Sequence, residues 1–170
     1  MERAGGSMWE KGVSWAMLNS KDLFLMIEED HGTISRILEQ IEDCGPYAAT
    51  KRLRLFSELK RLLPQQLLLE RDCLYQPVRT FSKLRASIAA AAHEQRAVQH
   101  ALGILEATPI GSSQWLPRFE DLLEDVEFHF SMEEVDLFRR MKDTLEPKAL
   151  SAIAREYRSR RRPHAERSAA

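Results

Sequence analysis

The stretch FEDLLEDVEFHFSMEEVDLFRRM, residues 119–141, decides the fold class of this 170-residue chain. Its apolar residues recur every three or four positions, and two polar residues fall on the same stripe. The stripe consists of Phe119, Leu122, Val126, His129, Glu133, Leu137 and Met141. This spacing is typical of one face of an amphipathic helix, because an α-helix completes a turn in 3.6 residues. The stretch therefore predicts a long helix with one buried face.

Three more segments with the same period lie upstream, and breaks in the pattern separate them. The breaks are Cys44-Gly45-Pro46, Gln76-Pro77, Thr108–Ser113 and Glu146-Pro147, and Gly and Pro commonly interrupt helices. They delimit helical segments at 19–43, 48–76, 79–107 and 113–145. Four helices with short connections predict an all-α fold, an up-down-up-down four-helix bundle, with a short extra helix after Pro147.

A single domain is expected, because 170 residues form one hydrophobic core rather than two. We expect residues 1–18 to be a loosely ordered leader, residues 19–145 to form the bundle, and residues 146–170 to form the short helix and a basic tail. Pro64 lies inside the second helical segment and removes a backbone donor, so it predicts a kink. The arginines of the tail are interleaved with one aromatic residue, Tyr157, which favours a solvated tail over a nucleic-acid-binding segment.

The composition is that of a soluble globular protein, with 44% hydrophobic and 30% charged residues and a net charge of -1. This balance requires neither nucleic acid nor a membrane surface as a partner. No stretch approaches the ~20 apolar residues of a membrane span. Cys44 and Cys73 form neither a disulfide framework nor a zinc motif. We therefore expect a cytoplasmic protein, and we leave open a homodimer.

Polar residues on the apolar stripes carry the functional information. They are His31, Gln66, Glu70, His129 and Glu133. A buried carboxylate is costly unless it is paired or bound to a metal. His129 and Glu133 are four residues apart, so both leave one helix face and can reach a single ion. Imidazole with carboxylate suits iron, zinc or manganese, whereas hydrogen-bonded core histidines and a Glu70–arginine ion pair are the metal-free alternative.

These residues form part of a repeated motif. The fourth segment reads HFSMEEVDLF over residues 129–138, and it resembles the motif of the hemerythrin-like (HHE cation-binding) family: His, three residues, one or two Glu, then an apolar-aromatic pair. The second segment, QLLLERDCLY over residues 66–75, has the same frame with Gln66 at the His position. His31 and His93 resemble the first-helix and third-helix histidines of the family. The resemblance covers about residues 20–145.

This resemblance implies a four-helix bundle with a non-haem iron centre. The implied metal ligands are His31, Glu70, His93, His129 and Glu133, with Glu70 and Glu133 bridging two metal ions. Family members bind dioxygen reversibly, sense oxygen or iron, or protect against oxidative stress. The implied partner is therefore dioxygen or a small oxygen-derived ligand.

Two positions depart from the family pattern. Gln66 stands at an expected His position, where its neutral amide oxygen is a weak iron ligand, and Ala97 stands where a second third-helix His is expected. The site is thus an asymmetric di-iron centre, a mononuclear centre, or a remnant without metal. The last case would make the protein a metal-free helical interaction or regulatory module. We expect a binding or sensing protein rather than an enzyme, with a di-iron oxidase or peroxidase left open.

Overall fold

The computed structural model describes residues 8–45 and 47–161, and the side chains from residue 23 onward. The described residues form helices and no strand, which confirms the all-α class. The α-helices are α1 (Met8–Glu42), α2 (Ala49–Glu70), α3 (Gln76–Val78), α4 (Arg85–Glu106), α5 (Trp115–Met132), α6 (Phe138–Thr144) and α7 (Pro147–Arg160). Two π-helical turns, η1 (Arg71–Tyr75) and η2 (Glu133–Leu137), join α2 to α3 and α5 to α6.

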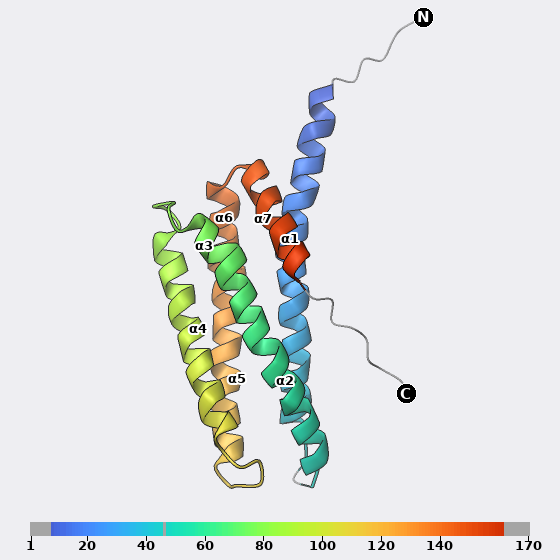
Figure 1. Ribbon diagram of the computed structural model, residues 1–170, viewed down its shortest axis with the longest axis vertical. Helices are drawn as coiled ribbons and strands as arrows, with labels where there is room; N and C mark the ends of the chain where they lie inside the picture. Colours follow the sequence, from blue (N-terminus) through green and yellow to red (C-terminus); the bar gives the residue numbers. More distant parts are fainter. Residues whose placement is uncertain (1–7, 46, 162–170) are drawn as a thin grey trace, which may run out of the picture.

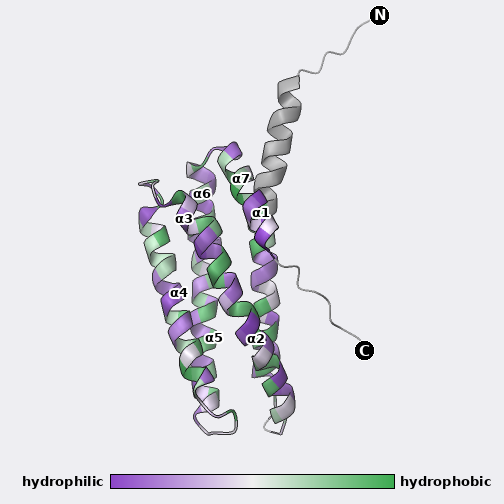
Figure 2. Cartoon of the chain, viewed as in Figure 1, coloured by the Kyte–Doolittle hydropathy of each residue, from purple (hydrophilic) through white to green (hydrophobic). Residues whose placement is uncertain are grey.

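The long helices α1, α2, α4 and α5 lie side by side, an arrangement consistent with a four-helix bundle (Figure 1). The connections from α1 to α2 and from α4 to α5 lie at the lower end in that view, and α3 lies at the upper end. Each of these helices carries both hydrophobic residues (green) and hydrophilic residues (purple) in Figure 2, as expected for amphipathic helices. No helix in the described part of the chain combines the length and apolar character needed to cross a membrane.

The expected helix boundaries agree with most of the observed ones. The break at residues 44–46 separates α1 from α2, and Pro147 occupies the first turn of α7, where its missing N–H has no helical partner to lose. α2 continues through Pro64, which lies on its exposed face. α1 begins at Met8, inside the segment expected as a leader, while residues 1–7 and the basic tail from residue 162 lie outside the described residues.

The hydrophobic core consists of two clusters at different heights of the bundle. The lower cluster includes Ile34, Leu38, Leu59, Leu63, Leu67, Val98, Leu105, Trp115, Phe119, Val126 and Phe130. The upper cluster includes Leu23, Phe24, Ile27, Cys73, Leu74, Ala91, Leu137, Phe138, Met141, Ile153 and Tyr157. Each fully buried large side chain contributes about 1.5–3 kcal/mol through removal of apolar surface from water. Burial of these side chains is therefore what holds the helices together and fixes their rotation.

The short C-terminal helix α7 packs along α1 (Figure 1). Its buried face adds Leu150, Ile153, Ala154 and Tyr157 to the core. At its end, Arg161 pairs with Asp30 of α1, with Nη2 2.8 Å from Oδ1. The Tyr157 hydroxyl donates to Oδ2 of the same carboxylate at 2.9 Å. α7 is therefore an integral part of the fold, and it brings a tyrosine to the middle of the bundle.

Candidate metal centre

A layer of polar side chains lies between the two apolar clusters. Each of the four long helices passes from one cluster to the other, and each carries a buried polar residue at the crossing. In chain order the crossings are Ile27–His31–Ile34, Leu67–Glu70–Cys73, Ala91–Gln95–Val98 and Val126–His129–Glu133–Leu137. We call His31, Gln66, Glu70, Gln95, His129 and Glu133 the polar layer. Because all of these side chains are at most 5% exposed, they interact with one another rather than with solvent.

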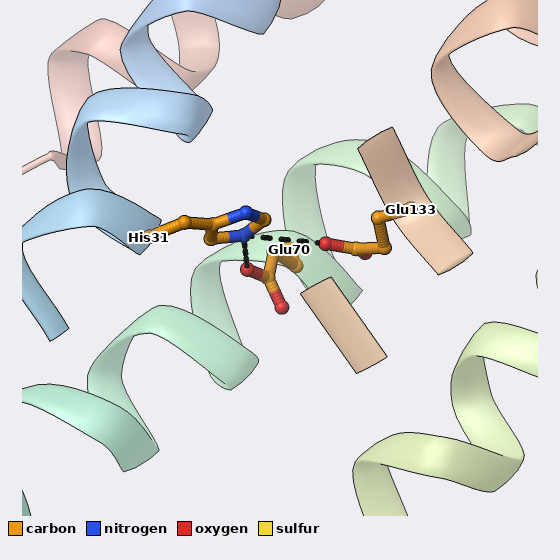
Figure 3. Close-up of side chains that lie close together, drawn as sticks. All are labelled: His31, Glu70 and Glu133. Atoms are coloured by element: carbon orange, nitrogen blue, oxygen red, sulfur yellow. Dashed lines mark hydrogen bonds and ion pairs between the residues drawn. The ribbon is translucent and has the colours of Figure 1, made fainter. Parts of the chain in front are cut away.

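Three side chains of the layer converge on one point. His31 of α1, Glu70 of α2 and Glu133 of η2 each offer a donor atom, and the three atoms lie within 4.8 Å of one another (Figure 3). His31 Nε2 lies 2.9 Å from Glu70 Oε1 and 3.4 Å from Glu133 Oε2. Two ligands at right angles, each about 2.1 Å from an ion, lie about 3 Å apart. The two distances from His31 Nε2 are therefore close to those between neighbouring ligands of one ion.

His129 extends this group on the side of Glu70. Its Nε2 atom lies 3.3 Å from Glu70 Oε2, the carboxylate oxygen that does not contact His31. Glu70 thus has one imidazole at each oxygen. Each oxygen of Glu70 therefore lies next to a different nitrogen donor.

Two buried amides complete the contacts of Glu70. Gln66 Nε2 donates to Glu70 Oε1 at 2.8 Å and lies 3.0 Å from the Tyr157 hydroxyl. Gln95 Nε2 donates to Glu70 Oε2 and to the Leu67 carbonyl oxygen, both at 2.9 Å. Gln95 was not among the predicted site residues. Gln95 is four residues after Ala91 and three before Val98, which is helical spacing, but alanines at 89, 90 and 92 give other faces of the helix the same apolar character.

His93, the predicted ligand on the third helix, does not join this group. It lies on the exposed face of α4, and its Nδ1 atom lies 3.5 Å from Arg96 Nη2. Gln95 is two residues further along, or about 200° around the helix, and occupies the inner position instead. The structure therefore brings together His31, Glu70, His129 and Glu133 and leaves His93 at the surface.

Partners outside the layer orient its side chains. The Glu134 carboxylate lies 2.7 Å from His31 Nδ1, which directs Nε2 toward Glu70 and Glu133. A carboxylate at the far nitrogen is the usual support of a metal-binding histidine. The Phe130 ring stacks on the His31 ring, with centroids 3.8 Å apart and planes 6° from parallel. His31 is thus held from both its edge and its face.

The two π-helical turns begin next to the site carboxylates. η1 follows Glu70 directly, and η2 starts at Glu133. In both turns the closing backbone bond spans five residues, from Gln76 N–H to Arg71 O and from Phe138 N–H to Glu133 O. Such turns occur often at functional sites, since the added residue redirects the side chains that follow. Here the redirected side chain is Tyr75, whose hydroxyl donates to Glu133 Oε1.

Electrostatics in the layer favour a charged carboxylate at Glu70. Burial opposes ionisation there, but hydrogen bonds from His129 and His31 outweigh it and lower the Glu70 pKa. Burial also acts against the charged forms of His31 and His129, yet their carboxylate contacts raise both pKa values. Burial and the nearby Glu70 charge raise the pKa of Glu133. The layer therefore contains two carboxylates whose charges repel, and a cation between them would relieve that repulsion.

One buried oxygen without a hydrogen bond, Glu133 Oε2, agrees with a cation in this layer. Glu133 Oε2 lies 3.4 Å from His31 Nε2 but has no hydrogen-bond partner among the described residues. His129 Nδ1 also has none, but it is the ring nitrogen that faces away from Glu70, so a metal ion would not account for it. An unsatisfied buried polar atom costs about 1–3 kcal/mol, so each one requires an explanation. A metal ion would bind Glu133 Oε2 directly, and a set of imidazoles and carboxylates suits iron, zinc or manganese. The residues present therefore fit a metal ion.

A family model confirms the resemblance seen in the motifs. The model of the hemerythrin HHE cation binding domain matches residues 22–140, which include every member of the polar layer. No curated protein matches the chain. No solved structure matches it either.

Proposed function

Because the chain belongs to the hemerythrin HHE cation-binding family, we propose that it is a non-haem iron-binding protein. The observation that carries the proposal is the convergence of His31, Glu70 and Glu133 within the polar layer, with His129 on the other oxygen of Glu70. Zinc and manganese are the alternative metals for these donors. We also propose the up-down-up-down order of helices that the sequence predicts. In that order, each of the four long helices runs past the level of the polar layer.

The ligands divide by role. His31 and His129 would supply nitrogen, and Glu70 and Glu133 would supply oxygen and balance the positive charge. Glu134 would hold His31 in the tautomer that leaves Nε2 free for the metal. Bound iron would supply reversible binding of a small ligand or redox chemistry. With amides from Gln66 and Gln95 pointing at Glu70, the centre has fewer nitrogen ligands than the family pattern provides.

A cavity beside Gln66 supports a role in binding a small external ligand. It has a volume of about 340 Å³ and is lined in part by Asp30, Leu62, Gln66 and Leu69. Gln66 is the one member of the polar layer that lines this cavity, and its amide donates to Glu70. The family pattern has a histidine at this position. A weak ligand there leaves a coordination position that dioxygen or a related molecule can fill. Storage, sensing or oxidative protection in the cytoplasm follows as the proposed cellular role.

A second candidate is a metal-free interaction or regulatory module. It is favoured by the many hydrogen bonds that Glu70 already accepts from Gln66, Gln95 and His31. Such a network stabilises a polar layer without any ion. The two candidates differ in one measurable property, the metal content of the purified chain.

The test is the iron content per chain after anaerobic reconstitution with ferrous iron and desalting, measured by mass spectrometry. We expect one or two irons per wild-type chain. His31→Gln should lose most of this iron, whereas His93→Gln, the matched change on the exposed face of α4, should keep it. Circular dichroism checks that both variants are folded. A wild-type protein that takes up no iron, zinc or manganese would refute the proposal and leave the metal-free module.

A further inference from the structure

Tyr75 is a buried phenol inside the proposed metal centre. It is 3% exposed, and its hydroxyl donates to Glu133 Oε1. Glu133 is one of the three residues whose donor atoms converge. The phenol oxygen is therefore in direct contact with a proposed ligand, as His31 is with Glu70.

The π-helical turn η1 explains how Tyr75 reaches this position. Tyr75 follows Glu70 by five residues, and in an α-helix a residue five positions on points about 140° away. The five-residue hydrogen bond of η1 widens the turn and aligns positions that are five apart. Glu70 and Tyr75 consequently both face the interior at the level of Glu133. The π-helical turn therefore places the Tyr75 phenol next to the Glu133 carboxylate.

We propose that Tyr75 is an iron ligand, binding ferric iron through its phenolate oxygen next to Glu133. The inference rests on the proposed iron-binding function and deepens it by naming a ligand outside the family motif. The Tyr75 hydroxyl contacts Oε1 of Glu133, and the other oxygen of the same carboxylate, Oε2, lies 3.4 Å from His31 Nε2. Glu133 therefore has the His31 imidazole at one oxygen and the Tyr75 phenol at the other, so both groups lie next to one proposed ligand.

The chemistry of the donors favours ferric iron for this ligand. Carboxylate and phenolate are hard anionic oxygens, and tyrosine is an established ligand of iron in proteins. Glu70, Glu133 and Tyr75 together would bring three negative charges to a trivalent ion. On binding, the phenol O–H bond breaks, an Fe–O bond forms and the proton leaves to solvent, with no change in oxidation state. Tyr75 would thereby supply an additional ligand to a centre in which Gln66 stands at a histidine position.

Tyr157 provides the matched control. It is also buried, but its hydroxyl contacts Asp30 and Gln66 rather than Glu70 or Glu133. Gln66 therefore stands between Tyr157 and the nearest proposed ligand, Glu70. The chain has 3 tyrosines, and the third, Tyr47, is 99% exposed.

The test uses the full chain loaded with iron and oxidised in air. Iron per chain is measured by mass spectrometry, and phenolate ligation by the visible charge-transfer band and by resonance Raman scattering from the phenolate ring. We expect wild type and Tyr157→Phe to show both signals. Tyr75→Phe should lose them while retaining at least half of the iron.

A second variant keeps the test decisive if Tyr75→Phe does not fold. The double variant Tyr47→Phe/Tyr157→Phe leaves Tyr75 as the one tyrosine of the chain, so phenolate signals that persist in it must come from Tyr75. Signals that survive in folded Tyr75→Phe would overturn the assignment. Iron-loaded wild type without phenolate signals would overturn it too, while leaving the iron-binding proposal intact. A wild-type chain that takes up no iron would overturn both.

Discussion

Glu70 is the residue whose replacement should disturb the polar layer most. It is fully buried and lies at the centre of four contacts. These are 2.9 Å to His31 Nε2, 2.8 Å to Gln66 Nε2, 2.9 Å to Gln95 Nε2 and 3.3 Å to His129 Nε2. The Glu70→Gln substitution keeps the size of the side chain but removes the charge. It also places an NH2 group where only acceptors fit, facing other donors.

The expected cost follows from these contacts. Breaking a buried ion pair by removing one partner costs about 3–5 kcal/mol, because the other charge stays buried. The histidines can release their protons, so the lower end, about 3 kcal/mol, is the expected loss in the free energy of unfolding. For a chain of this size, 1 kcal/mol corresponds to about 2–4 °C, so the melting temperature should fall by about 6–12 °C.

The assay is urea unfolding of chelator-treated protein at pH 6, followed by thermal melting with and without iron. Glu58→Gln, an exposed change on the same helix, is the control and should stay within about 0.5 kcal/mol of wild type. Iron at 100 times its dissociation constant should stabilise the wild type by about 2.7 kcal/mol, and Glu70→Gln should gain much less. If Glu70→Gln and Glu58→Gln have the same free energy of unfolding, Glu70 does not organise the polar layer.

Three further outcomes are expected. Gln66→His should increase iron affinity in a metal titration, while the lost hydrogen bond to Tyr157 lowers metal-free stability by about 1 kcal/mol. The free energy of unfolding of the metal-free protein, measured by urea titration, should be highest near pH 5–6. The raised pKa of His31 gives stability below about pH 6.5 that disappears at higher pH, and the lowered pKa of Glu70 gives stability above about pH 4.3 that disappears on acidification. Leu59→Ala, in the lower cluster, should cost about 2–5 kcal/mol in the same assay without changing iron stoichiometry.

The sequence predicted the polar layer on three helices because their stripes are narrow. His31, Glu70, His129 and Glu133 interrupt regular apolar stripes, so only one rotation of each helix buries the stripe, and that rotation points the polar residue inward. The buried apolar residues before and after each polar residue on the stripe then fix its position along the bundle axis. The structure places these four residues together, as the pattern predicted.

The third helix could not be oriented in the same way. Residues 89–92 are all alanine, so the helix has apolar surface on every side, and the pattern does not define which side is buried. His93 was chosen by family resemblance, but packing of Ala91 and Val98 turns Gln95 inward. Tyr75 was missed for a different reason: the 3.6-residue period cannot anticipate a π-helical turn, which changes the phase of every residue after it.

The energetics of the layer bear on which of the two candidate functions is correct. Replacing a buried ion pair by well-packed apolar residues is often neutral or stabilising by about 1–4 kcal/mol. The layer also leaves Glu133 Oε2 and His129 Nδ1 without hydrogen-bond partners among the described residues. A bundle that served only as a protein-interaction module would be at least as stable with leucines at these crossings. Since the fold does not need charged side chains between its two apolar clusters, metal binding is the better reason for their presence.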